Sequence, residues 1–355
     1  MQIILNQRCT FLIAATLCLV SVSCQKSTET SNNKFISDAN ALNAINKVEP
    51  TLNVSQAGFN VKVISFNVLA PCWASPQYYP ASSVSKLPKG YRRGRIINFL
   101  KQAVSSGASI IALQEVQLEE YPYFYDELKS LFAGSLSLHD DNYWSSWITS
   151  DPPFGRNGNA LFLRKDIFTN LQFTDKPLTN DGNHCVYATA QDILTKHNFR
   201  IASIHLDADN SNKRNNELNA IFSAMPPLVN TVDIVAGDFN AALSSGNLSN
   251  LMRQHSFYNA LDVAGIPEQT HPFTTSYNRN TNWGPIDHIA YRNAAIGGKI
   301  AVSNDGMPAI DNGVMDFNVW KLYPSGATYE AERINKNFDN CGSDHFPVTS
   351  TLFIK

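Results

Sequence analysis

The sequence is poor in charge: charged residues make up 16% of its 355 residues, and the formal net charge at pH 7 is only −2. An average soluble domain has roughly 25% charged residues. Disordered acidic or basic chains are excluded, because they combine low hydrophobicity with high net charge, whereas 43% of these residues are hydrophobic. A polybasic surface that holds nucleic acid mainly by counterion release is excluded as well. The length allows two domains or one large α/β domain.

Apolar runs long enough to span a bilayer are also absent. The run at residues 11–20 (FLIAATLCLV) is shorter than the roughly 20 residues that a membrane-spanning helix needs. It follows Arg8 and precedes the small residues Ser21 and Ser23, an order that is typical of a secretory signal peptide. We therefore expect residues 1–23 to be a signal peptide and the protein to be exported.

Cys24 stands directly after this segment and resembles the lipid-modified cysteine of bacterial lipoproteins. Ordinary signal cleavage after Ser23 would give the same mature start. Both a lipoprotein of the cell envelope and a soluble secreted protein therefore remain open. Residues 24–57 are rich in Ser, Thr and Asn and predict a polar tether. The uniform composition of residues 58–355 predicts a single domain.

Cysteine pairs with the CxxC spacing of a structural zinc site are absent. If the signal peptide is removed and Cys24 is lipidated, only Cys72, Cys185 and Cys341 remain. An odd number permits one disulfide bond and one free thiol, and the sequence does not choose the pair.

In the predicted domain, apolar runs of strand type alternate with helical patterns. The expected strands are residues 61–66, 109–113, 159–164, 199–204, 232–236 and 348–354. Helices are expected at residues 92–105, around Phe124, Leu128, Leu131 and Phe132 with an end near Gly134, and around Leu218, Ile221, Phe222 and Met225. This alternation predicts α/β layers, with helices that cover β-sheets.

Several of these apolar runs end beside a residue that can bind a metal ion or move a proton. The residues concerned are Asn67, Glu115, His205, Asp238 with Asn240, Asp287 and the pair Asp344-His345. In layered α/β proteins, loops at the strand ends expose side chains that the scaffold holds in place. Catalytic and binding residues are therefore common there. Each residue alone has a simpler interpretation, because a single strand-end acid or histidine more often caps a helix or serves the structure.

The residue types favour phosphate chemistry. Glu115, Asp344 and Asn67 offer hard oxygen ligands, which suit Mg²⁺ or Mn²⁺ better than zinc. Such an ion polarises a phosphoryl oxygen and stabilises a departing alkoxide. Asp238 can take a proton from water or orient it, and Asn240 can donate a hydrogen bond to water or to a phosphoryl oxygen.

The two histidines complete this interpretation. A carboxylate partner orients an imidazole and raises its pKa, and Asp287 could do this for His345. His205 and His345 would then donate to the negative charge that grows on phosphorus-bound oxygens. A basic cluster at residues 89–95 is most simply a solvated start of a helix, and a contact to a phosphate backbone is the alternative.

In chain order, seven motifs resemble the endonuclease/exonuclease/phosphatase superfamily, which has the deoxyribonuclease I-like fold. They are ISFNVLA (64–70), IIALQEV (110–116), GNALFLR (158–164), IASIHLD (201–207), VAGDFNA (235–241), PIDHIAY (285–291) and GSDHFPV (342–348). Any one motif is weak, whereas seven in family order are specific. The N-terminal motifs look most like the deadenylase branch, since FNVLA is followed by Tyr91-Arg92 with Arg95 and by LQEV with Tyr121.

The resemblance implies a four-layer α/β sandwich, in which two packed mixed β-sheets are flanked by helices and the site lies at one edge. It implies that Glu115 binds the metal ion, with Asn67 and Asp344 close to it. It also implies that Asp238 and Asn240 handle the attacking water and the phosphate. His205 would contact the phosphate, and Asp287 would pair with His345.

We therefore expect an exported phosphodiesterase that depends on Mg²⁺ or Mn²⁺ and attacks phosphorus with water in line. Nucleic acid is the first choice of substrate, and no protein partner is implied. A sphingomyelinase-type or other small-molecule phosphoesterase is an alternative, which an exposed apolar loop at residues 71–80 would favour. A catalytically inactive relative that acts as a binding protein is a second alternative, because a fold alone does not secure function.

Overall fold

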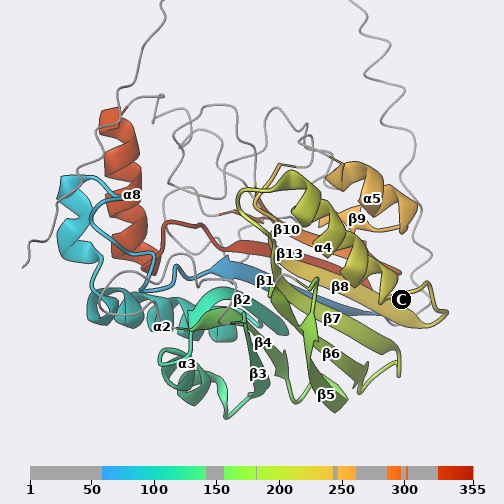
Figure 1. Cartoon of the computed structure of the whole chain (residues 1–355). Coiled ribbons are helices and arrows are strands. Elements are labelled where there is room, and N and C mark those ends of the chain that lie inside the picture. The colour runs from blue at the N-terminus through green and yellow to red at the C-terminus, as the bar shows by residue number, and fades with distance from the viewer. Residues whose placement is uncertain are drawn as a thin grey trace, which may run out of the picture. The chain divides into compact units, whose positions relative to one another are not determined.

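The structure is a computed structural model, and it describes residues 58–140, 156–180, 182–242, 247–260, 286–296, 301–302 and 327–354 (Figure 1). The expected signal peptide, Cys24 and the expected tether lie outside the described residues. None of the helices in the described ranges is long and apolar enough to cross a membrane.

The first β-sheet carries the N-terminal and C-terminal strands of the domain. Its strands are β1 (Phe59–Asn67), β2 (Ile110–Gln117), β3 (Phe132–Leu138), β4 (Asn157–Arg164), β11 (Ala295–Ile296), β12 (Ala301–Val302) and β13 (Val348–Ile354). They lie in the order β11-β13-β1-β2-β4-β3, and β12 pairs with β13. Strands β1 and β2 are parallel, so their carboxyl ends lie at the same edge of the sheet.

The second β-sheet is built from the middle of the chain. Its strands are β5 (Phe168–Pro177), β6 (His184–Asp192), β7 (Asn198–His205), β8 (Thr231–Asp238), β9 (Tyr258–Asn259) and β10 (Asp287–Arg292). The strand order is β5-β6-β7-β8-β10-β9, with β7 and β8 parallel and the other neighbours antiparallel. Each sheet therefore contributes one parallel pair.

The two sheets pack face to face around one apolar core, to which both contribute buried side chains. Helices α2 (Lys89–Ser105) and α3 (Tyr121–Leu128) cover the outer face of the first sheet, and α4 (Ser211–Ser223) and α5 (Leu248–Gln254) cover that of the second (Figure 1). Helix α8 (Ala327–Cys341) packs against α2 and against the 3-10 helix η1 (Ala81–Lys86). The predicted α/β fold class, two mixed sheets flanked by helices, is confirmed.

The predicted helix and strands near the first sheet follow from simple patterns. Helix α2 buries Ile96, Leu100 and Ala103 on one face, and Gly107 ends it with a φ of +85°, which suits glycine. Strands β2 and β8 are buried on both faces, which explains why their sequences are apolar runs without alternation.

One predicted element is wrong in its length. Helix α3 ends at Leu128, and Phe132 begins strand β3 instead of continuing the helix to Gly134. Gly134 lies in β3 opposite Phe162 of β4. Phe132 packs in the same apolar cluster as Phe124 and Leu128. A phenylalanine at this position would therefore be buried whether the backbone were helix or strand. The sequence pattern therefore could not separate helix from strand here.

The cysteine question left open by the sequence is answered by the structure. Cys72, Cys185 and Cys341 are all free thiols. Cys185 and Cys341 are fully buried, and burial raises the pKa of each thiol to about 12. Both therefore act as small apolar core residues.

Gly237 is required where the two parallel strands of the second sheet approach each other. A Cβ atom at this position would lie 2.0 Å from the backbone oxygen of Ile204 on β7. We predict that Gly237→Ala lowers the free energy of unfolding by about 1–3 kcal/mol, because the backbones must separate. Chemical denaturation measures this change.

Gly94→Ala is the matched control for this substitution. Gly94 lies inside helix α2, and a Cβ atom there meets nothing within 4 Å. We expect this change to be neutral or to stabilise by up to about 1 kcal/mol, because alanine favours the helix. A Gly237→Ala protein as stable as wild type would contradict the close strand pairing.

Candidate active site

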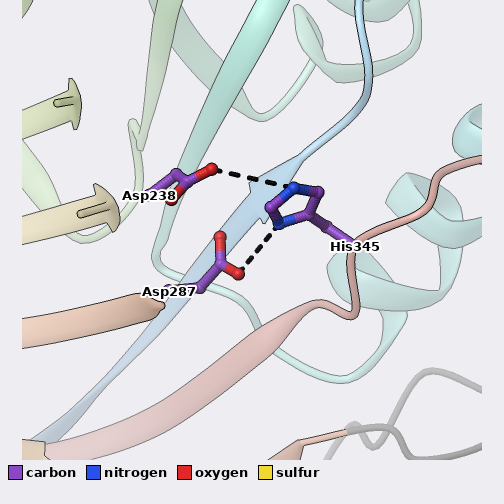
Figure 2. Close-up of side chains that lie close together, drawn as sticks. All are labelled: Asp238, Asp287 and His345. Atoms are coloured by element: carbon purple, nitrogen blue, oxygen red, sulfur yellow. Dashed lines mark hydrogen bonds and ion pairs between the residues drawn. The ribbon is translucent and has the colours of Figure 1, made fainter. Parts of the chain in front are cut away.

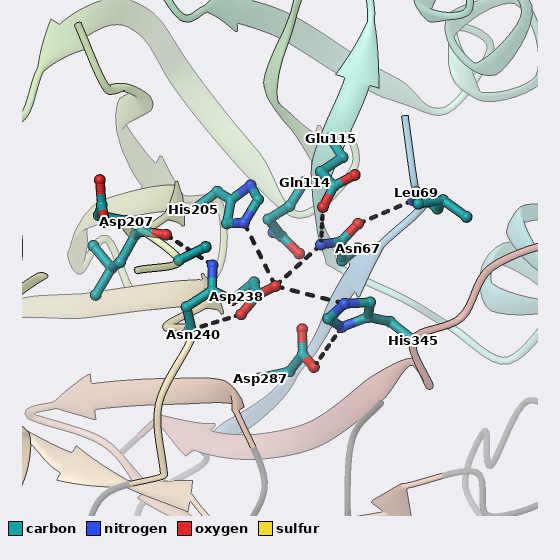
Figure 3. Close-up of polar contacts among 12 residues, drawn as sticks. Asn67, Leu69, Gln114, Glu115, His205, Asp207, Asp238, Asn240, Asp287 and His345 are labelled. Carbon is teal, nitrogen blue, oxygen red and sulfur yellow. Dashed lines mark hydrogen bonds and ion pairs between the residues drawn. The ribbon is translucent and has the colours of Figure 1, made fainter. Parts of the chain in front are cut away.

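The strand-end residues singled out in the sequence meet at one edge of the sandwich (Figure 3). They come from the ends of β1, β2, β7 and β8, from the start of β10, and from the segment that leads into β13. Their side chains are largely buried. The residues that the structure brings together are Asn67, Glu115, His205, Asp238, Asn240, Asp287, Asp344 and His345.

Asn67 links carboxylates from the two sheets. Its Nδ2 donates to Oε1 of Glu115 at 2.8 Å and to Oδ2 of Asp238 at 3.1 Å. Its Oδ1 accepts a hydrogen bond from the backbone N–H of Leu69 at 2.9 Å. In this arrangement the side chain aligns the two acids, and its expected role as a direct metal ligand stays a prediction.

Glu115 reaches the edge of the sheet because β2 is irregular at this point. The pairing of β2 with β4 shifts register between Leu113 and Val116, and Glu115 has a φ of +58°. Such a bulge re-aims a side chain that a regular strand would place on the outer face of the sheet, with Ile111 and Leu113. The second carboxylate oxygen, Oε2, accepts a hydrogen bond from the backbone N–H of Ala70 at 2.9 Å.

Strand register places Asp238 at the centre of the site. Asp238 on β8 is paired with His205 on the parallel strand β7 and with Asp287 on the antiparallel strand β10. Nε2 of His205 lies 3.6 Å from Oδ2 of Asp238. Oδ1 of Asp238 accepts a hydrogen bond from the backbone N–H of Asn240 at 2.8 Å. The carboxylate is therefore held from both sides.

His345 lies between two carboxylates (Figure 2). Its Nδ1 hydrogen-bonds Oδ2 of Asp287 at 2.9 Å, and its Nε2 lies 3.7 Å from Oδ2 of Asp238. Burial lowers the pKa of His345, but the negative charges of Asp287 and Asp238 outweigh it and raise this pKa well above its ordinary value. His345 is therefore an imidazolium at neutral pH, and the expected pair with Asp287 is present.

Asn240 occupies a left-handed backbone conformation, with a φ of +50°. Its Nδ2 donates to the backbone oxygen of Leu206, the residue after His205, at 2.8 Å. The loops that follow β7 and β8 are thereby joined beside the site. A second proton on the same amide nitrogen can still serve water or a phosphoryl oxygen, the role expected from the sequence.

Asp344 directly precedes His345 in the segment that leads into β13. Its Oδ2 accepts a hydrogen bond from the hydroxyl of Tyr79 at 3.0 Å. Burial raises the pKa of Asp344; the charge of His345 opposes this increase, and the charge of Glu115 adds to it. A buried acid whose pKa is raised by a neighbouring negative charge indicates a place where a cation is favourable.

The electrostatics around Glu115 fit a divalent ion. Burial and then the charge of Glu115 raise the pKa of Cys72 to about 12, and the same charge helps to raise that of Tyr79. The donors nearby are hard oxygens, which suit Mg²⁺ or Mn²⁺. A second group, Asp238, Asp287 and His345, has ligand atoms within 4.8 Å of one another, and the positive charge of His345 offsets part of its negative charge.

Arg92 was not expected to belong to the site, because the basic cluster was interpreted as a solvated helix start. Arg92 is instead 1% exposed. Its guanidinium donates to the backbone oxygens of Val68, Leu69 and Gly342, at 3.1, 2.8 and 3.2 Å. It therefore joins the loop after β1 to the segment that carries Asp344. Its position one helical turn before Ile96, on the buried face of α2, is the sequence signal that separates this arginine from the less buried Arg93 and Arg95.

His139 was also missed by sequence reasoning. It follows β3, is 2% exposed, and its ring centre lies 6.4 Å from that of His205. Its Nδ1 accepts a hydrogen bond from the backbone N–H of His184 at 3.1 Å. Burial, with smaller contributions from His205 and other cations, lowers the pKa of His139 to about 3. A neutral imidazole therefore lines the site next to His205.

The low pKa of His139 makes stability depend on pH. Between pH 6.5 and pH 3 the unfolded chain binds a proton here that the folded chain does not, so acidification favours unfolding. We predict that this histidine lowers the free energy of unfolding by about 1.4 kcal/mol for each pH unit of acidification within that window. In His139→Asn, which keeps an acceptor near the His184 N–H, unfolding free energy should fall less steeply from pH 6 to pH 4. Parallel curves for the two proteins would contradict the assignment.

Solved structures of other proteins share this architecture at low sequence identity. The catalytic domain of human Nocturnin has 17% identity and a TM-score of 0.55, with 82% of this chain and 94% of that chain covered. ANGEL2, described as a 2′,3′-cyclic phosphatase, has 15% identity and a TM-score of 0.56, with 84% and 96% covered. A mannosyl-6-phosphatase of Bacteroides thetaiotaomicron has 16% identity and a TM-score of 0.53, with 82% and 99% covered.

A search of curated proteins finds no match to this sequence. The sequence model of the endonuclease/exonuclease/phosphatase family, however, matches residues 64–345, which is most of the chain. The matched region begins in β1 and ends at His345, so it contains every residue described above except those of the final strand. This chain belongs to the endonuclease/exonuclease/phosphatase family, whose members are phosphoesterases that typically depend on a divalent metal ion.

Proposed function

We propose that this protein is an exported, divalent-metal-dependent phosphodiesterase, and that its substrate is most simply a nucleic acid. The observation that carries the proposal is the meeting of Glu115, Asp238 and His345 around one edge of the sandwich. Export is supported by the N-terminal sequence alone, where the apolar run precedes Cys24.

Asp238 is the group that would position the attacking water. Three side chains face its Oδ2: Asn67 at 3.1 Å, His205 at 3.6 Å and His345 at 3.7 Å. These contacts orient the Asp238 carboxylate, which could accept a proton as water attacks phosphorus. The backbone N–H of Asn240 holds the other oxygen, so the orientation is set before substrate arrives.

His345 and His205 would stabilise the charge that develops on the phosphoryl oxygens. The imidazolium of His345 is held by Asp287, so its positive charge stays at a defined place beside Asp238. A donor that is fixed in advance costs no reorganisation when negative charge grows. His205 flanks Asp238 from the neighbouring strand and offers a second donor.

Glu115 and Asp344 are the residues that would hold Mg²⁺ or Mn²⁺, and Asn67 would align Glu115 for it. Such an ion would supply Lewis-acid stabilisation of the departing oxygen. The hydrogen bond from Ala70 N–H and that from Asn67 fix both oxygens of Glu115, which limits the ligand to one orientation.

The sphingomyelinase-type alternative depended on an exposed apolar loop, and the structure does not show one at the expected place. Residues 71–80 were expected to be a candidate for an exposed apolar loop, but only Pro76 and Gln77 are exposed. Trp73, Ala74 and Tyr79 pack instead against a buried apolar cluster. The inactive-relative alternative has no support among the site residues, since all of the acids, amides and imidazoles are in place.

We predict that Glu115→Gln and Asp238→Asn each lower the turnover of a chromogenic bis-phosphodiester by about 10²–10⁴-fold while the melting temperature is retained. Both changes keep the shape of the side chain and remove its charge. Asp209→Asn is the matched control, because Asp209 is exposed and lies outside the site. EDTA should abolish wild-type turnover, and added Mn²⁺ or Mg²⁺ should restore it. Near-normal turnover by a folded Asp238→Asn protein would refute the assignment.

A panel of substrates distinguishes the candidate functions. Single-stranded and double-stranded DNA, RNA, sphingomyelin and sugar phosphates should be compared in the same buffer with Mn²⁺. We predict that a nucleic acid is cleaved with the highest kcat/KM and that Asp238→Asn loses this cleavage. A preference for sugar phosphates or sphingomyelin would replace the nuclease assignment, and inactivity on all of them would favour the binding relative.

A further inference from the structure

Tyr79 lies outside the seven family motifs, yet it contacts Asp344 directly. Its hydroxyl donates to Oδ2 of Asp344 at 3.0 Å, across 265 positions of sequence. Tyr79 stands in the segment between β1 and η1, and Asp344 stands between α8 and β13. This hydrogen bond therefore joins two segments that lie far apart in sequence, beside the proposed metal ligands.

The ring of Tyr79 is held in place by packing. It makes an edge-to-face contact with Phe338 of α8, with ring centres 5.5 Å apart and an interplanar angle of 70°. The same apolar cluster contains Leu69 and Leu87. Leu69 is also the residue whose N–H donates to Asn67. The Tyr79 hydroxyl is thus fixed relative to both Asp344 and the carboxylate that Asn67 aligns.

The Tyr79 hydroxyl is held at a fixed place beside the Asp344 carboxylate. Its ring packs among apolar side chains, and its oxygen lies 3.0 Å from Oδ2 of Asp344. The hydrogen bond restricts rotation of the Asp344 carboxylate about its Cβ–Cγ bond.

We propose that Tyr79 is a positioning residue that holds the Asp344 carboxylate in the orientation required to bind the divalent cation. The inference rests on the proposed function, because it assigns Asp344 to the cation. Hydrogen-bond partners of metal ligands typically contribute 10–100-fold to metal affinity. A hydroxyl that acts only as packing would contribute nothing to metal affinity.

Tyr79→Phe separates the two roles of the side chain. It keeps the ring that packs on Phe338 and removes only the hydroxyl. Tyr78→Phe is the matched control, because it removes the same hydroxyl from the neighbouring residue. The folding of both variants is checked by near-ultraviolet circular dichroism and by melting temperature in EDTA. The probe is Mn²⁺ alone. It is titrated into the full chain, and calorimetry measures its binding.

We expect Tyr79→Phe to weaken Mn²⁺ binding by about 10-fold or more, and Tyr78→Phe to leave it unchanged. The Mg²⁺ concentration that gives half-maximal kcat should rise in Tyr79→Phe, and saturating Mg²⁺ should restore most of kcat. In an Asp344→Asn background, Tyr79→Phe should have no further effect on Mn²⁺ affinity, because the two residues act through one carboxylate.

Three results would overturn the inference, and they can be distinguished from one another. If wild type binds Mn²⁺ and Tyr79→Phe binds it equally well, Tyr79 is not a positioning residue and the proposed function stands. If wild type binds no Mn²⁺ and Glu115→Gln changes nothing, the metal-dependent function fails and the inference fails with it. An additive effect of Tyr79→Phe in the Asp344→Asn background also contradicts the proposal, because the hydroxyl would then act elsewhere.

Discussion

Two buried carboxylates from different β-sheets meet at one amide group, and the remaining geometry of the site depends on this contact. Asn67 donates to Glu115 of the first sheet and to Asp238 of the second. A buried carboxylate is costly unless hydrogen bonds replace its hydration, and here each acid also receives a backbone N–H, from Ala70 or Asn240. The contact therefore holds two negative groups close together, which the His345 imidazolium and the proposed cation would balance.

The architecture explains why such a contact forms at this edge. Each sheet contains one parallel pair, so the carboxyl ends of β1 and β2 and those of β7 and β8 face the same region. The antiparallel strand β10 then brings Asp287 directly opposite Asp238. Glu115 and Asp344 bring negative charge to the site, and His345 brings a positive charge beside Asp238.

The sequence predicted the layers, and it singled out the residues that meet at this edge, because both depend on local patterns. Buried parallel strands are apolar runs, and a polar residue where such a run ends is visible without coordinates. Tyr79, His139 and Arg92 could not be found this way. Each is polar or basic, each is buried by segments distant in sequence, and only the packed structure shows that they contact the site. The strand at residues 132–138 was missed because a buried phenylalanine serves a helix and a strand equally well.

The central claim is that Glu115, aligned by Asn67, and Asp344 hold a divalent cation beside Asp238. Crystals soaked in Mn²⁺ and measured at the manganese absorption edge test it most directly, because the anomalous signal locates the ion without reference to activity. The account predicts one strong anomalous peak within about 2.5 Å of a Glu115 carboxylate oxygen. A strong peak elsewhere, with none at Glu115, would contradict it.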